Sequence, residues 1–306
     1  MRDPIPVWTA WARKMVTFES ISSAEFRRPL TQQEYVNRMT RIQRRAAQSD
    51  DMLVKTTSLW TMENLSASFQ RNARPGQSLK DARLPVEVKP IAHCGIGIGA
   101  VELSRFQIRK LISLIDSFSD QSYRMFAFEN VGAMLRVYEP GVFNATARFF
   151  AMLGILPVAQ LQRPEPRSYL GAFEPEAQRL ISHGYGRMLY FTSNDILGAV
   201  RAAVRLACFP LGPCVNGIAF AYSMVNNRDL RRVFMAGQHL QQHEIGRFFT
   251  EGLTFALEFW EWFSPGLLDR IKPWSSYGNF LIETARNGVA AGRARGALAP
   301  FAVEGD

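Results

Sequence analysis

Histidine and glutamate recur along the chain in short segments that also contain glycine, and these are residue types that carry protons in enzymes. Three segments place a histidine three or four residues before a glycine, and they begin at His93, His183 and His243. Histidine ordinarily changes charge near neutral pH, and burial can shift a glutamate toward the same range. If the chain is an enzyme, these histidines together with Glu129 and Glu251 are the predicted proton carriers.

A second recurrence places an acidic or amide side chain beside a glycine that opens an apolar helix, in residues 128–133, 215–220 and 250–256. In two of the histidine segments an arginine directly follows the glycine, and a guanidinium can orient a carboxylate or a phosphate. We therefore predict four ligand-binding residues, namely Asn130, Arg187, Asn216 and Arg247.

The same recurrences have a structural explanation that needs no ligand. A glycine lets two helices approach closely, and an asparagine or glutamate can bond the free amide groups at a helix start. Helix pairs repeated in this way would build a solenoid-like or toroidal domain. Helix packing is the simpler interpretation, and convergence of the histidines and acids on one cavity is the alternative.

Two further patterns could bind a cofactor or a metal, and neither is complete. Residues 95–100 have the spacing of a dinucleotide-binding loop, but Pro90 interrupts the strand that should precede such a loop. His239 and His243 could share a metal if a nearby glutamate joined them, although a surface pair is the simpler interpretation. Cys94 is interpreted as a buried, unreactive thiol. We predict no metal and no cofactor.

The first 90 residues form a predicted basic helical region that ends in a connecting arm. Thr31 followed by Glu34 has the pattern of a capping box, which predicts a helix from this point. Four arginines at helical spacing should share one face of this helix, which is interpreted as solvated, and they are Arg38, Arg41, Arg44 and Arg45. Prolines and a glycine in residues 74–90 predict an arm whose last part, residues 85–90, is extended.

Residues 91–306 form the predicted helical core, so the fold class is predicted to be all-α. Apolar residues recur at the helical period, and the two-residue alternation of strands is scarce. The predicted helices cover residues 100–118, 125–138, 143–156, 174–190, 195–208, 215–225, 229–237, 243–263 and 277–291, with a polar link at residues 163–167.

Composition limits the partners and the location of the chain. Of its 306 residues 47% are hydrophobic, and 22 are phenylalanines that should pack in a core or around an apolar cavity. Three cysteines argue against a disulfide framework. A formal charge of +9 favours an acidic partner, but nucleic acid is not the expected one. The chain shows neither a secretory signal nor an apolar run of membrane-spanning length, so a cytoplasmic location is expected.

Residues 125–139, 182–195 and 215–230 resemble a family of uncharacterised proteins known mainly from bacterial gene clusters for enediyne biosynthesis. The resemblance covers residues 123–256, with Asn130 where the family has glycine and Glu251 where it has glutamine. It implies bacterial natural-product biosynthesis with a hydrophobic polyketide- or polyene-like intermediate. The family supplies no catalytic residue to carry over.

Two functional hypotheses follow, and they belong to different classes. In the first, the chain acts on or holds a hydrophobic intermediate in a Phe-lined helical cavity, and as an enzyme it would be a cofactor-independent cyclase or isomerase. In the second, it is a non-catalytic binding or scaffold protein that docks an acidic carrier protein, a partner enzyme or a membrane surface. The sequence leaves open whether the chain is an enzyme.

Overall fold

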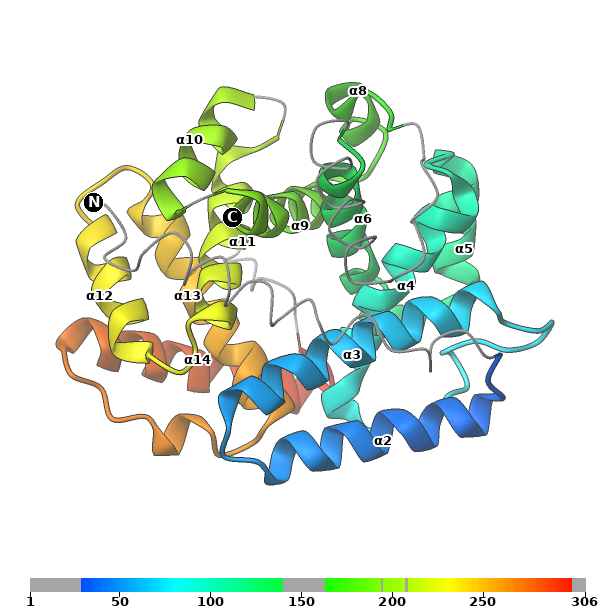
Figure 1. Ribbon diagram of the computed structural model, residues 1–306, viewed down its shortest axis with the longest axis horizontal. Coiled ribbons are helices and arrows are strands. Elements are labelled where there is room, and N and C mark those ends of the chain that lie inside the picture. The colour runs from blue at the N-terminus through cyan, green and yellow to red at the C-terminus, as the bar shows by residue number, and fades with distance from the viewer. Residues whose placement is uncertain (1–28, 140–162, 194, 207–208, 299–306) are drawn as a thin grey trace, which may run out of the picture.

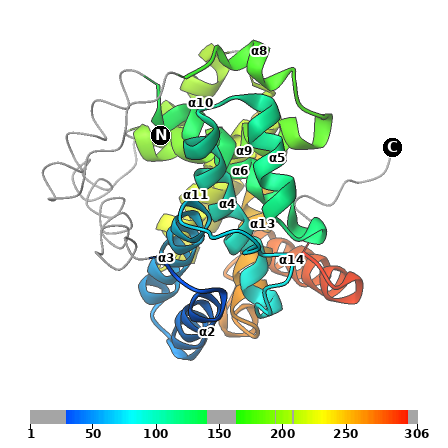
Figure 2. The same ribbon diagram turned by 90° about the vertical axis from the view of Figure 1, so that its right-hand side faces the viewer.

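The all-α prediction is confirmed by a computed structural model, which describes residues 29–139, 163–193, 195–206 and 209–298. These ranges contain twelve α-helices and three short 3-10 helices, and no strand is present in them. The arrangement of the helices is shown in Figure 1 and, after a quarter turn, in Figure 2. The helix predicted at residues 143–156 lies outside the described residues.

The chain begins, within the described part, with the antiparallel pair α2 (Gln32–Gln48) and α3 (Met52–Arg71). The predicted capping box is confirmed, because the Thr31 hydroxyl accepts from the Glu34 amide while the Glu34 carboxylate accepts from the Thr31 amide. The two helices lie side by side at one end of the molecule (Figures 1 and 2). They therefore bring the N-terminal region into contact with the core.

The extended conformation predicted for residues 85–90 is wrong. Residues Val86–Val88 form a 3-10 helix (η2), and α4 (Lys89–Ser104) follows directly with Pro90 in its first turn. Proline suits this position because its missing N–H would have no partner in the first helical turn. Pro85 and Pro90 therefore start helical turns, whereas residues 74–85 contain no helix and connect α3 to η2.

The single helix predicted at residues 100–118 is also wrong, because two helices cover this range. Helix α4 ends at Ser104, and α5 (Ile108–Phe118) begins after a sharp turn. Arg105 and Phe106 have left-handed backbone angles, with φ of 52° and 62°. Glycine is the usual residue in this conformation, so the amino-acid types gave no signal of the break.

A row of helices forms the centre of the molecule, and each packs against the next. The row runs in the order α3, α4, α6 (Phe126–Val137), α9 (Pro175–Thr192), α11 (Leu211–Val225) and α13 (Gly246–Phe263). Glycines bring their backbones into contact, because a Cβ on Gly132 of α6 would overlap with the Ile181 carbonyl of α9. A Cβ on Gly217 of α11 would likewise overlap with the His183 carbonyl of α9. The recurring glycines are therefore helix-packing residues, as the simpler interpretation proposed.

The remaining helices cover this row. They are α8 (Pro166–Leu170), α10 (Ile196–Leu206), α12 (Leu230–Leu240) and α14 (Ser276–Arg295), with 3-10 helices η3 (Gln121–Tyr123) and η4 (Leu268–Arg270) between longer elements. The link predicted at residues 163–167 is helical from Pro166 onward, because the Glu165 side chain caps α8. Helix α14 packs on α13, and α10 packs on α9 and α11.

The predictions about architecture have different outcomes. Six predicted helices between residues 125 and 291 correspond to α6, α9, α10, α11, α12 and α14, and the seventh to α13, which starts at Gly246 and not at His243. Solenoid or toroidal repetition is not confirmed, and the domain boundary at residue 90 remains a prediction. Among the described residues, no helix is both long and apolar enough to cross a membrane.

Candidate functional site

A cluster of buried charged side chains lies where α3, α6 and α9 meet. Its members are Glu63 of α3, Glu129 of α6, and His183 and Arg187 of α9, and each side chain is at most 7% exposed. Arg187 Nε lies 3.1 Å from Glu129 Oε1, and Arg187 Nη2 lies 3.1 Å from Glu63 Oε1. His183 Nδ1 lies 3.3 Å from Glu129 Oε1. One guanidinium therefore pairs with two carboxylates, and one of these also meets an imidazole.

Asn130 connects the members of this cluster. Its side-chain amide donates to Glu63 Oε1 and, at 2.7 Å, to the Cys94 carbonyl of α4, while its oxygen accepts from Arg187 Nη2. The Asn130 amide therefore has its polar atoms engaged by three other helices. A bonded amide at this position fixes the rotamer of Arg187 and orients Glu63 toward the guanidinium.

The pKa values of the two carboxyl groups move in opposite directions. Burial raises the pKa of Glu63, and the neighbouring Glu129 charge adds to this effect against the influence of Arg187. Burial also opposes ionisation of Glu129, but the Arg187 charge and contacts from His183 and Cys94 outweigh it and lower the pKa of Glu129. The cluster thus favours the charged form of Glu129, which balances Arg187, more strongly than the charged form of Glu63.

Burial lowers the pKa of His183, and the positive Arg187 acts in the same direction, against the influence of Glu129. The Cys94 thiol is buried, as predicted, and burial raises its pKa well above its usual range, which disfavours the reactive thiolate. The site therefore holds two carboxyl groups, Glu63 and Glu129, whose pKa values move in opposite directions, beside a histidine of lowered pKa. A site that pushes neighbouring pKa values apart is a candidate for acid–base chemistry.

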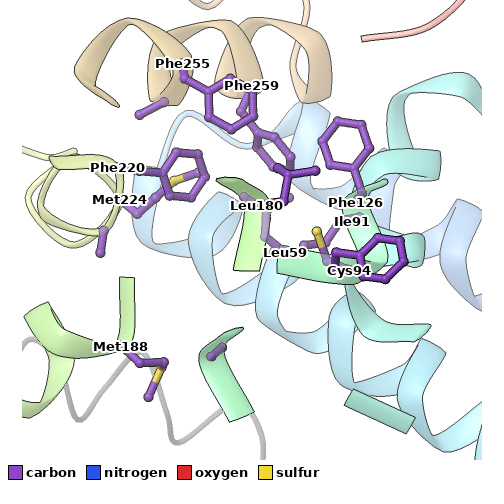
Figure 3. Close-up of a cluster of buried hydrophobic side chains, with 14 of the residues drawn as sticks. Leu59, Ile91, Cys94, Phe126, Leu180, Met188, Phe220, Met224, Phe255 and Phe259 are labelled. Atoms are coloured by element: carbon purple, nitrogen blue, oxygen red, sulfur yellow. The ribbon is translucent and has the colours of Figure 1, made fainter. Parts of the chain in front are cut away.

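A small apolar cavity adjoins the cluster. Its volume is about 30 Å³, and Glu129, His183 and Arg187 form the polar part of its wall. The aromatic part comes from α3, α6, α11 and α13, and the residues are Trp60, Phe126, Phe220, Phe255 and Phe259. Figure 3 shows Phe255 and Phe259 projecting from α13 toward Phe220 of α11, with ring centroids 5.5 and 5.8 Å from that of Phe220.

Trp60 lies between the cluster and the surface. Among the described residues that line the cavity it alone is partly exposed, and the others are buried. The Arg187 guanidinium lies over its ring at 5.2 Å from the centroid, which is a favourable cation–π distance. Trp60 therefore covers both the guanidinium and the side of the cavity nearest to solvent.

The structure brings together four of the nine predicted site residues, namely Glu129, Asn130, His183 and Arg187. It places His93 elsewhere, although also in the core. The His93 ring bridges the Lys89 carbonyl at 2.7 Å and the Asp120 amide at 3.0 Å, and burial lowers its pKa to about 4. Because both ring nitrogens have backbone partners, His93 connects α4 to η3 and does not face the cavity.

Three other predicted residues lie on the surface near the start of α13. His243 is exposed in the turn before this helix, and Arg247 and Glu251 form an exposed ion pair at 3.0 Å. His239 and His243 have ring centroids 6.0 Å apart, as a surface pair would. Within the described residues, no group of three histidine, cysteine, aspartate or glutamate side chains could hold a metal ion.

Asn216 is buried in α11 but does not line the cavity. A Cβ on Gly252 of α13 would overlap with the Asn216 carbonyl, so this segment is a contact between α11 and α13. The predicted side-chain role in ligand binding therefore has no supporting contact.

The dinucleotide-loop alternative is wrong, because its glycines lie inside helix α4. A Cβ on Gly95 would overlap with the Glu63 carbonyl of α3, and one on Gly97 would overlap with the Ala127 carbonyl of α6. These glycines let α4 fit between two helices that carry the charged cluster. They do not form a loop that could bind a phosphate.

Two residues of the site were missed by the sequence analysis, Glu63 and Trp60. Both belong to α3, in the stretch of residues 59–69 that is otherwise apolar or small. A single glutamate among residues with helical apolar spacing is a signal that could have identified Glu63, because an isolated buried charge needs a partner.

Comparison with known proteins gives no match, because no family model, curated protein or solved structure matches the chain. The resemblance to the enediyne-associated family therefore remains a prediction.

Proposed function

We propose that the chain binds a hydrophobic small molecule at the aromatic cavity and acts on it by acid–base chemistry without a cofactor. The observation that carries this proposal is the position of Glu129, His183 and Arg187 in the wall of a cavity whose other described lining residues, apart from Thr56, are apolar or aromatic. The resemblance of residues 123–256 supports a polyketide- or polyene-like intermediate of natural-product biosynthesis as the ligand.

Isomerisation or cyclisation is the reaction class that fits these groups. Glu129 is the base, because its lowered pKa keeps it ionised, and the neutral His183 beside it can accept or return a proton. A proton taken from one carbon and returned to another leaves the composition of the substrate unchanged, so no co-reactant is needed. Removal of a proton leaves negative charge on the substrate, and the Arg187 guanidinium in the same wall would stabilise it until the proton is returned.

The size of the cavity sets a condition on this proposal. A volume of about 30 Å³ accommodates a water molecule or two but not a polyketide. Side chains must therefore move when the ligand binds, and Trp60 is the lining residue with the most freedom to move, since the others are buried.

The test compares buried and exposed residues of the same type in the organism that makes the protein. His183→Ala and Glu129→Gln should abolish or strongly reduce the metabolite that depends on this chain. The matched controls are His243→Ala and Glu251→Gln, which change exposed residues and should leave the metabolite at its normal level. Circular dichroism of the purified variants checks that each is folded, and Glu129→Asp provides a milder change.

Normal metabolite levels in folded His183→Ala and Glu129→Gln variants would rule out a role for the cluster in the reaction. Equal loss in the exposed controls would show that the effect does not come from the buried site.

A second candidate function rests on a different observation. Arg41, Arg44 and Arg45 are exposed around a shallow hollow on the outer face of α2, whereas Arg38 is partly buried. This surface would suit an acidic carrier protein, as a scaffold role requires. Binding of such a carrier should weaken steeply as ionic strength rises and should be reduced by Arg44→Glu. Binding that is insensitive to both changes would contradict docking through α2.

A further inference from the structure

A second cavity opens on the surface where α10, α11 and α12 meet, and none of the described residues that line it also lines the buried cavity. Its volume is about 600 Å³, which is within the usual range of small-molecule sites. Helices α10 and α12 lie next to α11 on the same side of the molecule (Figure 1). The cavity is thus a groove between two surface helices with the core helix α11 as its base.

The floor of the groove is apolar. Ile196 and Leu197 come from the first turn of α10, and Ala236 and Leu240 come from α12. Met235, also in the lining, is 57% exposed and is one of the most exposed large apolar side chains of the described part. An apolar surface of this kind would be covered by a chain of methylene groups.

The charged groups of the groove are arranged so that positive charge is available to a ligand. Arg231 is exposed on α12, as is His239, and His243 is exposed in the turn that follows this helix. The described lining also holds a second arginine, Arg232, and two aspartates. Asp195 accepts from the Gly198 amide at 2.6 Å and Asp229 accepts from the Arg232 amide at 3.2 Å. Both carboxylates therefore cap the first turns of α10 and α12, where the helix dipole favours them.

We propose that this groove binds a single-chain amphiphile with an anionic head group, such as a medium-chain carboxylate. The alkyl chain lies on Ile196, Leu197 and Ala236, and the carboxylate is held by Arg231 at the exposed edge. A cationic head group would lose this attraction, and a short chain would lose apolar contact. The groove thus distinguishes ligands by both charge and chain length.

The test uses decanoate as the probe, with hexanoate and decyltrimethylammonium as comparisons, titrated into the full-length chain by calorimetry. Decanoate should bind, and affinity should rise from hexanoate to decanoate by up to about fourfold for each added methylene group. Decyltrimethylammonium should bind about tenfold more weakly than decanoate, or more weakly still, because it loses one attraction and adds one repulsion at Arg231.

Methionine methyl signals locate the bound probe. Met235 lines the groove and Met224 lines the buried cavity, so ¹³C-methyl labelling of methionine distinguishes the two sites. Decanoate should shift the Met235 signal and leave that of Met224 unchanged, with Met235→Leu and Met224→Leu used for assignment. A shift of Met224 alone would place the probe in the buried cavity and overturn the groove proposal without touching the proposed function.

A pair of charge reversals tests the head-group contact. Arg231→Glu should weaken decanoate binding by about fivefold or more, as loss and reversal of an exposed ion pair predict. Arg44→Glu makes the same charge change on α2 and should leave the affinity unchanged. The proposal is overturned if decanoate does not bind, if the cationic probe binds equally well, or if both reversals have the same effect.

Discussion

The backbone carbonyl of Glu129 occupies the space that a side chain on Gly184 would need, because a Cβ at that position would overlap with the oxygen. The contact is nearly reciprocal, since a Cβ on Gly132 would overlap with the Ile181 carbonyl. Helices α6 and α9 therefore touch backbone to backbone, and this contact brings Glu129 to His183 and Arg187. Gly184 therefore lets two helices pack closely, and the same packing brings the ionisable side chains together, so both interpretations of the recurring glycines hold at this position.

Replacing Gly184 by alanine should therefore separate α6 from α9. We expect Gly184→Ala to lower the free energy of unfolding by about 3 kcal/mol or more, because a backbone carbonyl cannot move away as a flexible side chain can. Gly171→Ala is the matched control, since its Cβ would meet no atom closer than 3.6 Å and should change stability by less than about 0.5 kcal/mol. Urea denaturation measures both, and equal stability of the two variants would contradict the close contact.

Removing the shared guanidinium should make stability depend on pH in a defined direction. In Arg187→Met, burial would raise the pKa of both Glu63 and Glu129, because the positive charge that opposes this effect is gone. A carboxyl with a raised pKa contributes stability below its ordinary value of 4.5, and this contribution is lost as pH rises. The free energy of unfolding of Arg187→Met should be lower than that of wild type by about 3–5 kcal/mol at pH 8, and by clearly less at pH 5.

The control for this experiment is Arg247→Met, which removes an exposed guanidinium paired with Glu251. Exposed ion pairs contribute about 0–1 kcal/mol, so this variant should differ little from wild type at either pH. A loss in Arg187→Met that is the same at pH 5 and pH 8 would show that the buried carboxyl groups do not depend on Arg187.

Helix packing was largely predictable from the sequence, whereas the membership of the site was only partly so. Glu129 lies three residues before Gly132 and therefore on the same face of α6, toward α9. Glu251 directly precedes Gly252, so it lies about 100° around α13 and faces solvent. His243 precedes the first residue of α13 and lies on no helix face. The motifs look alike in sequence, but the glutamate or histidine of each one lies at a different position relative to the glycine. One such side chain therefore points into the core while others point to solvent.

The parts of the fold that sequence reasoning missed have physical causes that residue types do not reveal. The break after α4 uses left-handed angles at Arg105 and Phe106, where the buried Phe106 ring packs against Tyr138 and Tyr169. The packing of the buried Phe106 ring offsets the conformational cost of the left-handed backbone at this turn. Glu63 was missed because its partners are more than sixty residues away in sequence.

The cost of that backbone conformation can be measured at Arg105, whose side chain is exposed. Arg105→Gly should raise the free energy of unfolding by about 0.5–1 kcal/mol, because glycine adopts left-handed angles without a Cβ penalty. Phe106→Gly relieves the same conformation but removes a buried ring, so it should lower stability by about 3 kcal/mol. A stabilising effect of both variants, or of neither, would contradict this account of the turn.

Glu258 should make the contact between α13 and α14 sensitive to pH. Burial raises its pKa from 4.5 to about 7, and a Cβ on Gly288 of α14 would overlap with its carboxyl oxygen. Because the pKa of Glu258 is higher in the folded than in the unfolded protein, Glu258 contributes fully to the free energy of unfolding below about pH 4.5. This contribution is lost as pH rises through about 7. Glu258→Gln should remove this part of the pH dependence, on the order of 2–3 kcal/mol.

Thermal or urea unfolding between pH 4.5 and 8 measures that dependence. Glu251→Gln is the comparison, because it changes an exposed carboxylate on the same helix and should leave the profile as in wild type. Identical profiles for wild type and Glu258→Gln would contradict the assignment of the pH dependence to Glu258.

The central claim, that the buried cluster faces a cavity for a hydrophobic ligand, is tested most directly by native mass spectrometry of the protein purified from its own organism. We expect a bound hydrophobic molecule in wild type and in Glu251→Gln, and its absence in Leu180→Phe, where a larger side chain fills the cavity. Wild-type protein that carries no small molecule, or a ligand retained equally in Leu180→Phe, would contradict it.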